Sequence, residues 1–220
     1  MNKKIIINND SESLRHLIKA DKRFATLYRL VGELSYQLSG DPYSFIIETI
    51  VGQMISNKVA EMFTDRLIKI CNSGKIDTNS VKRLSLDKLQ SIGISRRKAQ
   101  CIIDFTDKYD AKKYTAKNLS SLSDDEIIKE ITSVKGLGIW SAKMFLLFVL
   151  GKENILPYED AAFLQAFVWY NGLFSSPSKT DIKKMGEKWS PYMSVAARYL
   201  YKALDNGLTK KPFSSYYISF

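Results

Sequence analysis

The stretch SVKGLGIWSAKMFLLFVLG, residues 133–151, joins two closely spaced glycines to the longest unbroken apolar run of the chain. Gly136 and Gly138 can both take a positive φ, and because neither has a Cβ, another backbone can come close. A helix that starts at about Ile139 would then point its unpaired N–H groups at an anion. Taken alone, the two glycines are better explained by a helix C-cap followed by a tight turn.

The composition is that of an ordinary globular protein with a marked excess of basic residues. Of 220 residues, 45% are hydrophobic, and 33 basic against 23 acidic side chains give a net charge of +10. This balance favours a polyanionic partner, nucleic acid first and an anionic membrane second, and the alternative is a merely basic protein. We find no targeting segment, no membrane span and no strongly amphipathic basic helix. A cytoplasmic protein with no membrane partner is expected.

The cysteines and the histidine argue against a metal centre. Cys71 and Cys101 both lie in apolar helical patterns and are expected to be buried free thiols in a reducing compartment. Together with the single His16, they are too few for a zinc site or an iron–sulfur cluster. No required cofactor is expected.

The hydrophobic pattern is helical nearly throughout and predicts an all-α protein. Asp41 and Asp160 each stand where an N-cap is expected, and Gly172 stands where the helix after Asp160 should end. Only KIIIN, residues 4–8, indicates a strand. SIGISRRKA, residues 91–99, is a weak echo of GLGIWSAKM in the opening stretch, although any helical hairpin gives such an echo.

In context, the opening stretch resembles the helix–hairpin–helix motif of the HhH-GPD DNA glycosylase superfamily. That pattern continues with an aspartate, and Asp160 lies 22 positions after Gly138. Three other segments are similar to parts of this family: DPYSFIIETIVGQMISNKVA (41–60), SIGISRRKAQCIIDF (91–105) and WSPYMSVAARYLYKAL (189–204). The resemblance covers roughly residues 22–205 and is greatest for the 3-methyladenine DNA glycosylase II branch.

The resemblance implies a two-lobed helical bundle with a DNA-binding cleft between the lobes. We expect residues 1–220 to form one HhH-GPD unit. Its middle lobe should span about 40–150 and contain the hairpin 133–141. The second lobe combines residues 1–39 and 151–220. The implied partner is double-stranded DNA containing a damaged base, bound by a monomer at the nucleoid.

Asp160 matches the catalytic aspartate of the family. A carboxylate held near C1′ stabilises the oxocarbenium character that develops when an N-glycosidic bond breaks, and it can orient or deprotonate the attacking water. The alternative is that Asp160 only caps the following helix. The neighbouring Glu159 departs from the usual family triplet, and its role stays open.

Trp140 stands where bifunctional members of the family carry a lysine, whose amine forms a Schiff base and permits strand cleavage. Tryptophan cannot do this, so the resemblance implies an enzyme without AP-lyase activity. In similar alkylpurine glycosylases an aromatic side chain at this position lines the base pocket, where an indole would stack well on a cationic purine. The alternative is a core tryptophan.

Further residues are assigned to DNA and to an ion by the resemblance alone. Met54 falls at the position of the wedge that fills the gap left by a flipped base, with Gln53 beside it to contact the widowed partner base; otherwise Met54 is a core methionine. Lys143 is either a phosphate contact or a solvated charge. The expected phosphate-binding hairpin comprises Gly136, Leu137, Gly138, Ser141 and Lys143, and the carbonyls expected to hold Na⁺ or K⁺ are those of Thr132, Val134 and Leu137.

The function implied is that of a monofunctional DNA glycosylase of base excision repair that removes an alkylated purine such as 3-methyladenine. Two alternatives stay open. One is a glycosylase for an oxidised or deaminated base, and the other is a non-catalytic helix–hairpin–helix DNA-binding protein.

Overall fold

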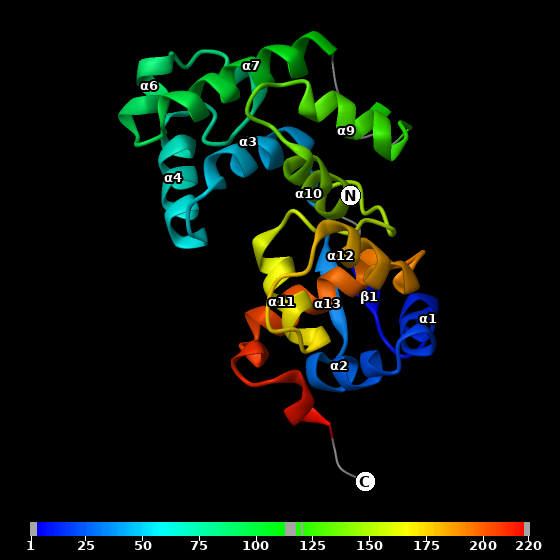
Figure 1. The fold of residues 1–220 in the computed structure, drawn as a ribbon. Coiled ribbons are helices and arrows are strands. Elements are labelled where there is room, and N and C mark those ends of the chain that lie inside the picture. Colours follow the sequence, from blue (N-terminus) through cyan, green and yellow to red (C-terminus); the bar gives the residue numbers. More distant parts are fainter. Residues whose placement is uncertain (1–3, 113–117, 120, 218–220) are drawn as a thin grey trace. The chain divides into compact units, whose positions relative to one another are not determined.

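The computed structural model describes residues 4–112, 118–119 and 121–217. Its contacts divide the chain into a terminal unit, Met1–Leu38 with Gly151–Phe220, and a middle unit, Ser39–Leu150. The expected all-α class is confirmed, since the regular structure of the described residues is helical apart from one two-stranded sheet (Figure 1). Within these residues no helix combines the length and hydropathy needed to cross a bilayer.

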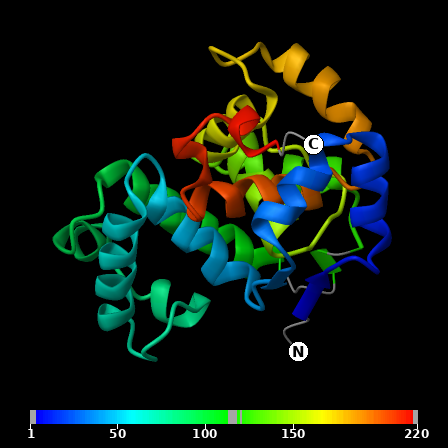
Figure 2. The same ribbon diagram turned by 90° about the horizontal axis from the view of Figure 1, so that it is seen from below.

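The middle unit is built around α3 (Pro42–Gly52), which Asp41 caps by accepting hydrogen bonds from the N–H groups of Tyr43 and Ser44. The predicted cap is therefore confirmed. The other helices of this unit are α4 (Asn57–Ile70), α5 (Thr78–Val81), α6 (Leu86–Ser91), α7 (Arg96–Lys112), α9 (Asp124–Thr132) and α10 (Ile139–Phe148). α3 contacts α4, α7 and α10 (Figures 1 and 2). This central position places the end of α3 among helices that are distant in sequence.

The hairpin, residues 133–141, consists of a connection, 133–138, between α9 and α10 and the first residues of α10. α9 begins with a capping box between Ser123 and Glu126. Its other end is held by Lys108 of α7, whose ammonium pairs with the Glu130 carboxylate at 3.0 Å and donates to the Glu130 carbonyl at 2.7 Å and to the Ser133 hydroxyl. A cation at a helix C-terminus is favourable, so this contact fixes the entry to the hairpin.

α10 is the buried helix that the apolar run predicts. It begins at Ile139, as expected, and every residue from Ser141 to Leu147 is buried. Since α10 is mostly apolar and buried on all sides, it forms the platform behind the hairpin.

The terminal unit brings together the two ends of the chain. Its elements are β1 (Lys4–Ile7), α1 (Glu12–Ala20), α2 (Arg23–Val31), β2 (Leu34–Gln37), α11 (Ala161–Asn171), α12 (Lys179–Gly186), α13 (Met193–Asp205) and the 3₁₀ helices η1 (Glu187–Trp189), η2 (Leu208–Lys210) and η3 (Phe213–Tyr216). β1 pairs antiparallel with β2 in the register Lys4↔Gln37 to Ile7↔Leu34. β1 was predicted, whereas β2 was missed because only one of its four residues is buried.

The core of the terminal unit is aromatic. α11 packs against α13 (Figure 1). Trp189 and Tyr170 are fully buried, and the ring of Phe167 meets that of Trp189 edge-on at 5.7 Å. α11 ends, as predicted, at Gly172, which has the left-handed values φ 64° and ψ 34°. The aromatic contact therefore joins α11, which follows Asp160, to η1.

A buried carboxylate joins three parts of the terminal unit. Asp21 is 7% exposed, pairs with Arg23 at 3.0 Å and with Lys188 at 2.8 Å. Burial alone would raise the pKa of Asp21, but the hydrogen bonds and charges of Arg23 and Lys188 outweigh it and lower the pKa from 3.8 to about 2. The ionised form of Asp21 therefore stabilises the fold.

We expect the stabilisation from Asp21 to depend on pH. Because its pKa is lower in the folded chain, the contribution is complete above about pH 4 and is lost as the pH falls through about 2. Replacing Asp21 by Asn should lower the free energy of unfolding by about 2 kcal/mol at neutral pH and by much less at pH 2. Denaturant unfolding across this range measures the difference.

Asp110→Asn is the matched control, because the Lys82–Asp110 pair is exposed at both ends. Such a pair contributes about 0–1 kcal/mol. A loss for Asp21→Asn that did not change with pH would contradict the assignment.

Candidate functional site

Gly136 is a position where only glycine fits. Its φ is 104°, a value that other residues rarely adopt, and a Cβ built there would lie 2.9 Å from the Sγ of Cys101. The neighbouring Leu137 is buried and its N–H donates to the Val134 carbonyl at 3.0 Å. The first glycine of the hairpin is therefore explained by the fold of the protein itself.

Gly138 differs, and the expectation of a positive φ is wrong for it. Its φ is −112° and its ψ is −177°, values open to any residue, and a Cβ built there would meet nothing within 4 Å. Neither backbone conformation nor packing within the chain requires this glycine. What its missing side chain leaves open is the approach to the start of α10.

The first turn of α10 presents backbone rather than side-chain polarity. Its first backbone bond runs from Ala142 N to Gly138 O, so the preceding N–H groups have no intrahelical acceptor. Ser141 as a whole is 1% exposed, so its contact with a phosphate stays a prediction. Lys143 is 9% exposed, so its interpretation as a solvated charge is wrong, while its phosphate contact stays a prediction. Trp140 is half-buried.

Met54 has two unusual properties at once. It is 100% exposed, so the interpretation as a core methionine is wrong. It is also the one non-glycine residue with a positive φ, 58°, in the described part of the chain. A long apolar side chain in this conformation is disfavoured by roughly 1–2 kcal/mol, and strain of this kind clusters at functional sites. The loop therefore holds an apolar side chain out in solvent at a cost in stability.

Gln53, next to Met54, is tied to the hairpin. Its Nε2 donates to the Gly136 carbonyl oxygen at 3.0 Å, across 83 positions of sequence. The structure thus brings together the two segments assigned to DNA in the middle unit, namely the Met54 loop and the hairpin. The predicted contact of Gln53 with a partner base stays a prediction.

Asp160 caps α11 in the terminal unit. Its Oδ1 accepts the Phe163 N–H at 2.8 Å, and its side chain is half-buried. The positive end of a helix favours a carboxylate at this place. The cap that the sequence predicted is confirmed, and it fixes the orientation of the same carboxylate that is the catalytic candidate.

Two residues that support Asp160 were missed by sequence reasoning. Buried Ser194 at the start of α13 accepts the Ile155 N–H at 2.9 Å and donates to the Lys152 carbonyl at 2.6 Å, which holds the loop before Asp160. Tyr201 on α13 faces the carboxylate, and its pKa is raised first by burial and then by the Asp160 charge. Local patterns cannot reveal either contact, because both link residues about 40 positions apart.

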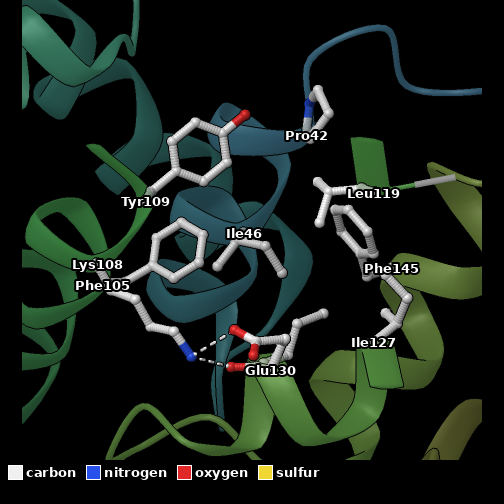
Figure 3. Close-up of a pocket in the computed structure, with 10 residues that line it drawn as sticks. Pro42, Ile46, Phe105, Lys108, Tyr109, Leu119, Ile127, Glu130 and Phe145 are labelled. Atoms are coloured by element: carbon white, nitrogen blue, oxygen red, sulfur yellow. Dashed lines mark hydrogen bonds and ion pairs between the residues drawn. The ribbon is translucent and has the colours of Figure 1, made fainter. Parts of the chain in front are cut away.

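One cavity of the middle unit is too small to be the base pocket. Figure 3 shows it between Ile46, Phe105 and Phe145, with the Lys108–Glu130 pair at one side. Its volume of about 20 Å³ suits a single water molecule rather than a purine. It is a packing void.

The family model described as HhH-GPD superfamily base excision DNA repair protein matches residues 47–191, which include the Met54 loop, the hairpin and Asp160. The chain belongs to the HhH-GPD superfamily. The resemblance inferred from sequence is therefore confirmed.

Curated proteins of this kind are similar over most of the chain. DNA-3-methyladenine glycosylase 1 of Schizosaccharomyces pombe is 25% identical over 205 residues, covering 91% of this chain and 90% of its own. The putative DNA-3-methyladenine glycosylase YfjP of Bacillus subtilis is 24% identical, covering 74% of this chain and 59% of its own.

Solved structures show the same HhH-GPD fold. S. pombe Mag1, a 3-methyladenine DNA glycosylase in complex with abasic DNA, has a TM-score of 0.82 at 24% identity, covering 89% of this chain and 97% of its own. A DNA-3-methyladenine glycosidase from Bacillus halodurans has a TM-score of 0.81 at 24% identity, covering 94% and 96%.

Replacing the two hairpin glycines by alanine should affect different properties, namely stability at Gly136 and DNA affinity at Gly138. Gly136→Ala should lower the free energy of unfolding by about 2 kcal/mol, because it forces a positive φ and a clash with Cys101. Gly138→Ala should leave stability unchanged within about 0.5 kcal/mol, but it should weaken DNA binding because its methyl group fills the open approach to α10. Thermal unfolding and fluorescence anisotropy with a duplex measure the two effects. Wild-type affinity in Gly138→Ala would refute close backbone approach at this position.

Proposed function

We propose that this HhH-GPD protein is a monofunctional DNA glycosylase that hydrolyses the N-glycosidic bond of an alkylated purine such as 3-methyladenine in double-stranded DNA. The observation that carries the proposal is the Asp160 carboxylate, oriented by the Phe163 N–H at 2.8 Å within the segment matched by the family. The relatives named as 3-methyladenine glycosylases support the substrate class.

The proposed reaction needs the damaged base outside the duplex. Met54 takes the place of the flipped nucleotide, and the backbone N–H groups at the start of α10 bind a phosphate. Asp160 stabilises positive charge on the sugar as the C1′–N bond breaks and its electron pair leaves with the base. Water adds its oxygen to C1′ and loses a proton, which leaves an abasic site and the free base.

Trp140 supports the monofunctional part of the proposal. Schiff-base chemistry at C1′ requires an amine, and an indole has none to offer. The half-buried indole is instead suited to stack on a positively charged alkylated purine. The neutral oxidised purines lack this cation–π attraction.

A monovalent cation fits the hairpin by its donor chemistry. The carbonyl oxygens of Thr132, Val134 and Leu137 would hold it, and Val134 O, which already accepts the Leu137 N–H at 3.0 Å, retains a second lone pair. A bound Na⁺ or K⁺ would add positive charge beside the phosphate contact. We propose that the protein acts as a monomer on DNA at the nucleoid of the cytoplasm.

Asp160→Asn tests the catalytic assignment. The variant keeps an oxygen that can accept the Phe163 N–H, so fold and DNA affinity should stay near wild type. Base release should fall about 10²–10⁴-fold, because the amide has no charge with which to stabilise the sugar cation. Single-turnover release of 3-methyladenine from a duplex measures the rate, and Glu159→Gln is the neighbouring control. Wild-type release by Asp160→Asn would eliminate Asp160 as the catalytic group.

A lesion panel tests the substrate class and the absence of lyase activity. Duplexes should contain 3-methyladenine, 7-methylguanine, hypoxanthine, uracil or 8-oxoguanine. We expect release of the alkylated purines, with strand nicking only after added base and no borohydride-trapped adduct. DNA binding without release of any base would favour the non-catalytic alternative, and nicking without added base would contradict the monofunctional assignment.

A further inference from the structure

Two hydrogen bonds from distant parts of the middle unit hold the chain directly before Met54, where α3 leads into the Met54 loop, residues 52–56. Gln53 Nε2 donates to the Gly136 carbonyl at 3.0 Å. Two residues earlier, at the end of α3, the Val51 carbonyl accepts a hydrogen bond from Lys98 Nζ at 2.7 Å. Lys98 is half-buried, and this burial lowers the pKa of its ammonium group. The strained residue therefore follows directly after a stretch that is anchored at two points.

The two anchors come from the two glycine turns whose sequences are similar. Gly93 and Gly136 have nearly equal φ values, 100° and 104°, and a Cβ on either would clash, with Phe63 at 2.6 Å or with Cys101 at 2.9 Å. The following Ile94 is buried, as is its counterpart in the hairpin. The structural likeness is therefore offset by two positions from the weak sequence echo, in which Gly93 stands opposite Gly138. The hairpin holds Gln53 through the Gly136 carbonyl, and α7, which follows the turn at Gly93, holds Val51 through Lys98.

The anchors account for a conformation that Met54 alone does not favour. Its side chain is 100% exposed, so no packing offsets the positive φ of 58°. The nearest backbone hydrogen bonds of the loop, Gln53 N to Ile50 O and Ile55 N to Gly52 O, are both long at 3.4 Å. The two side-chain hydrogen bonds, at 3.0 and 2.7 Å, are shorter than these backbone bonds and tie the start of the loop to distant segments.

We propose that Gln53 and Lys98 are positioning residues that hold Met54 in its protruding conformation before DNA binds, and that Gln53 fastens the wedge to the phosphate-binding hairpin instead of reading the partner base. Because the acceptor of Gln53 is the carbonyl of Gly136 itself, the wedge and the hairpin form one rigid element. The description of Met54 as a wedge rests on the proposed function, whereas the anchoring of the loop does not.

Hydrogen exchange of the free protein tests the anchoring without DNA. In Gln53→Ala, amides of residues 52–56 should exchange roughly three- to tenfold faster, the effect expected for one lost hydrogen bond. Lys98→Met should act in the same direction and gives a second variant if the first folds poorly. Gln100→Ala is the matched control, because Gln100 is exposed and its amide binds only Asp104 of the same helix in the described structure. Unchanged exchange in both loop variants would overturn the proposal, even if the protein proves to be a glycosylase.

A double-mutant cycle tests the link to Met54. Gln53→Ala and Met54→Ala should each slow single-turnover base release, and the double variant should be no slower than Met54→Ala alone. The ratios of rates with adenine, cytosine, guanine or thymine opposite the lesion should be unchanged by Gln53→Ala. Multiplying effects, or a changed preference for the opposite base, would show that Gln53 acts on DNA directly. If the wild-type protein releases no base, the proposed function fails while the exchange experiment still decides the anchoring.

Discussion

The close packing of Gly136 against Cys101 is the constraint on which the rest of the middle unit depends. With a Cβ there, a contact of 2.9 Å with sulfur would push the hairpin off α7. The Gly136 carbonyl would move with it, and that oxygen is the acceptor that ties down the Met54 loop. One missing side chain thus sets the positions of α10, the hairpin and the exposed methionine together. These features are separated in sequence but share one backbone position.

Asp160 can cap α11 and still serve as the proposed catalytic carboxylate. A carboxylate has two oxygens, and Oδ1 is committed to the Phe163 N–H. This hydrogen bond orients the carboxylate and leaves it negatively charged. The buried Tyr201 hydroxyl faces the same carboxylate, and its raised pKa indicates that it stays protonated beside the negative charge. A helix N-terminus is therefore a suitable support for a carboxylate whose orientation must be fixed.

The sequence predicts those features of the fold that depend on interactions between residues close together in the chain. The caps at Asp41 and Asp160, the left-handed Gly172 and the buried helix after Ile139 all follow from patterns within a few residues. The features that it missed depend on distant partners. β2 forms where the chain returns beside β1 after about 30 residues, and Gln53 meets the hairpin across 83 positions. The residues of the candidate site could be named from the family pattern, but the support of Met54 and Asp160 could not.

Cys101, which lies against the hairpin, also has a chemical consequence. Burial raises the pKa of its thiol to about 11, so at neutral pH the sulfur is almost wholly the neutral thiol. Methylating agents and peroxides attack thiolates far faster than thiols. The buried, neutral Cys101 thiol therefore reacts more slowly with such agents than an exposed thiolate would. The contact that shapes the hairpin thus rests on a sulfur atom that is chemically unreactive for a cysteine.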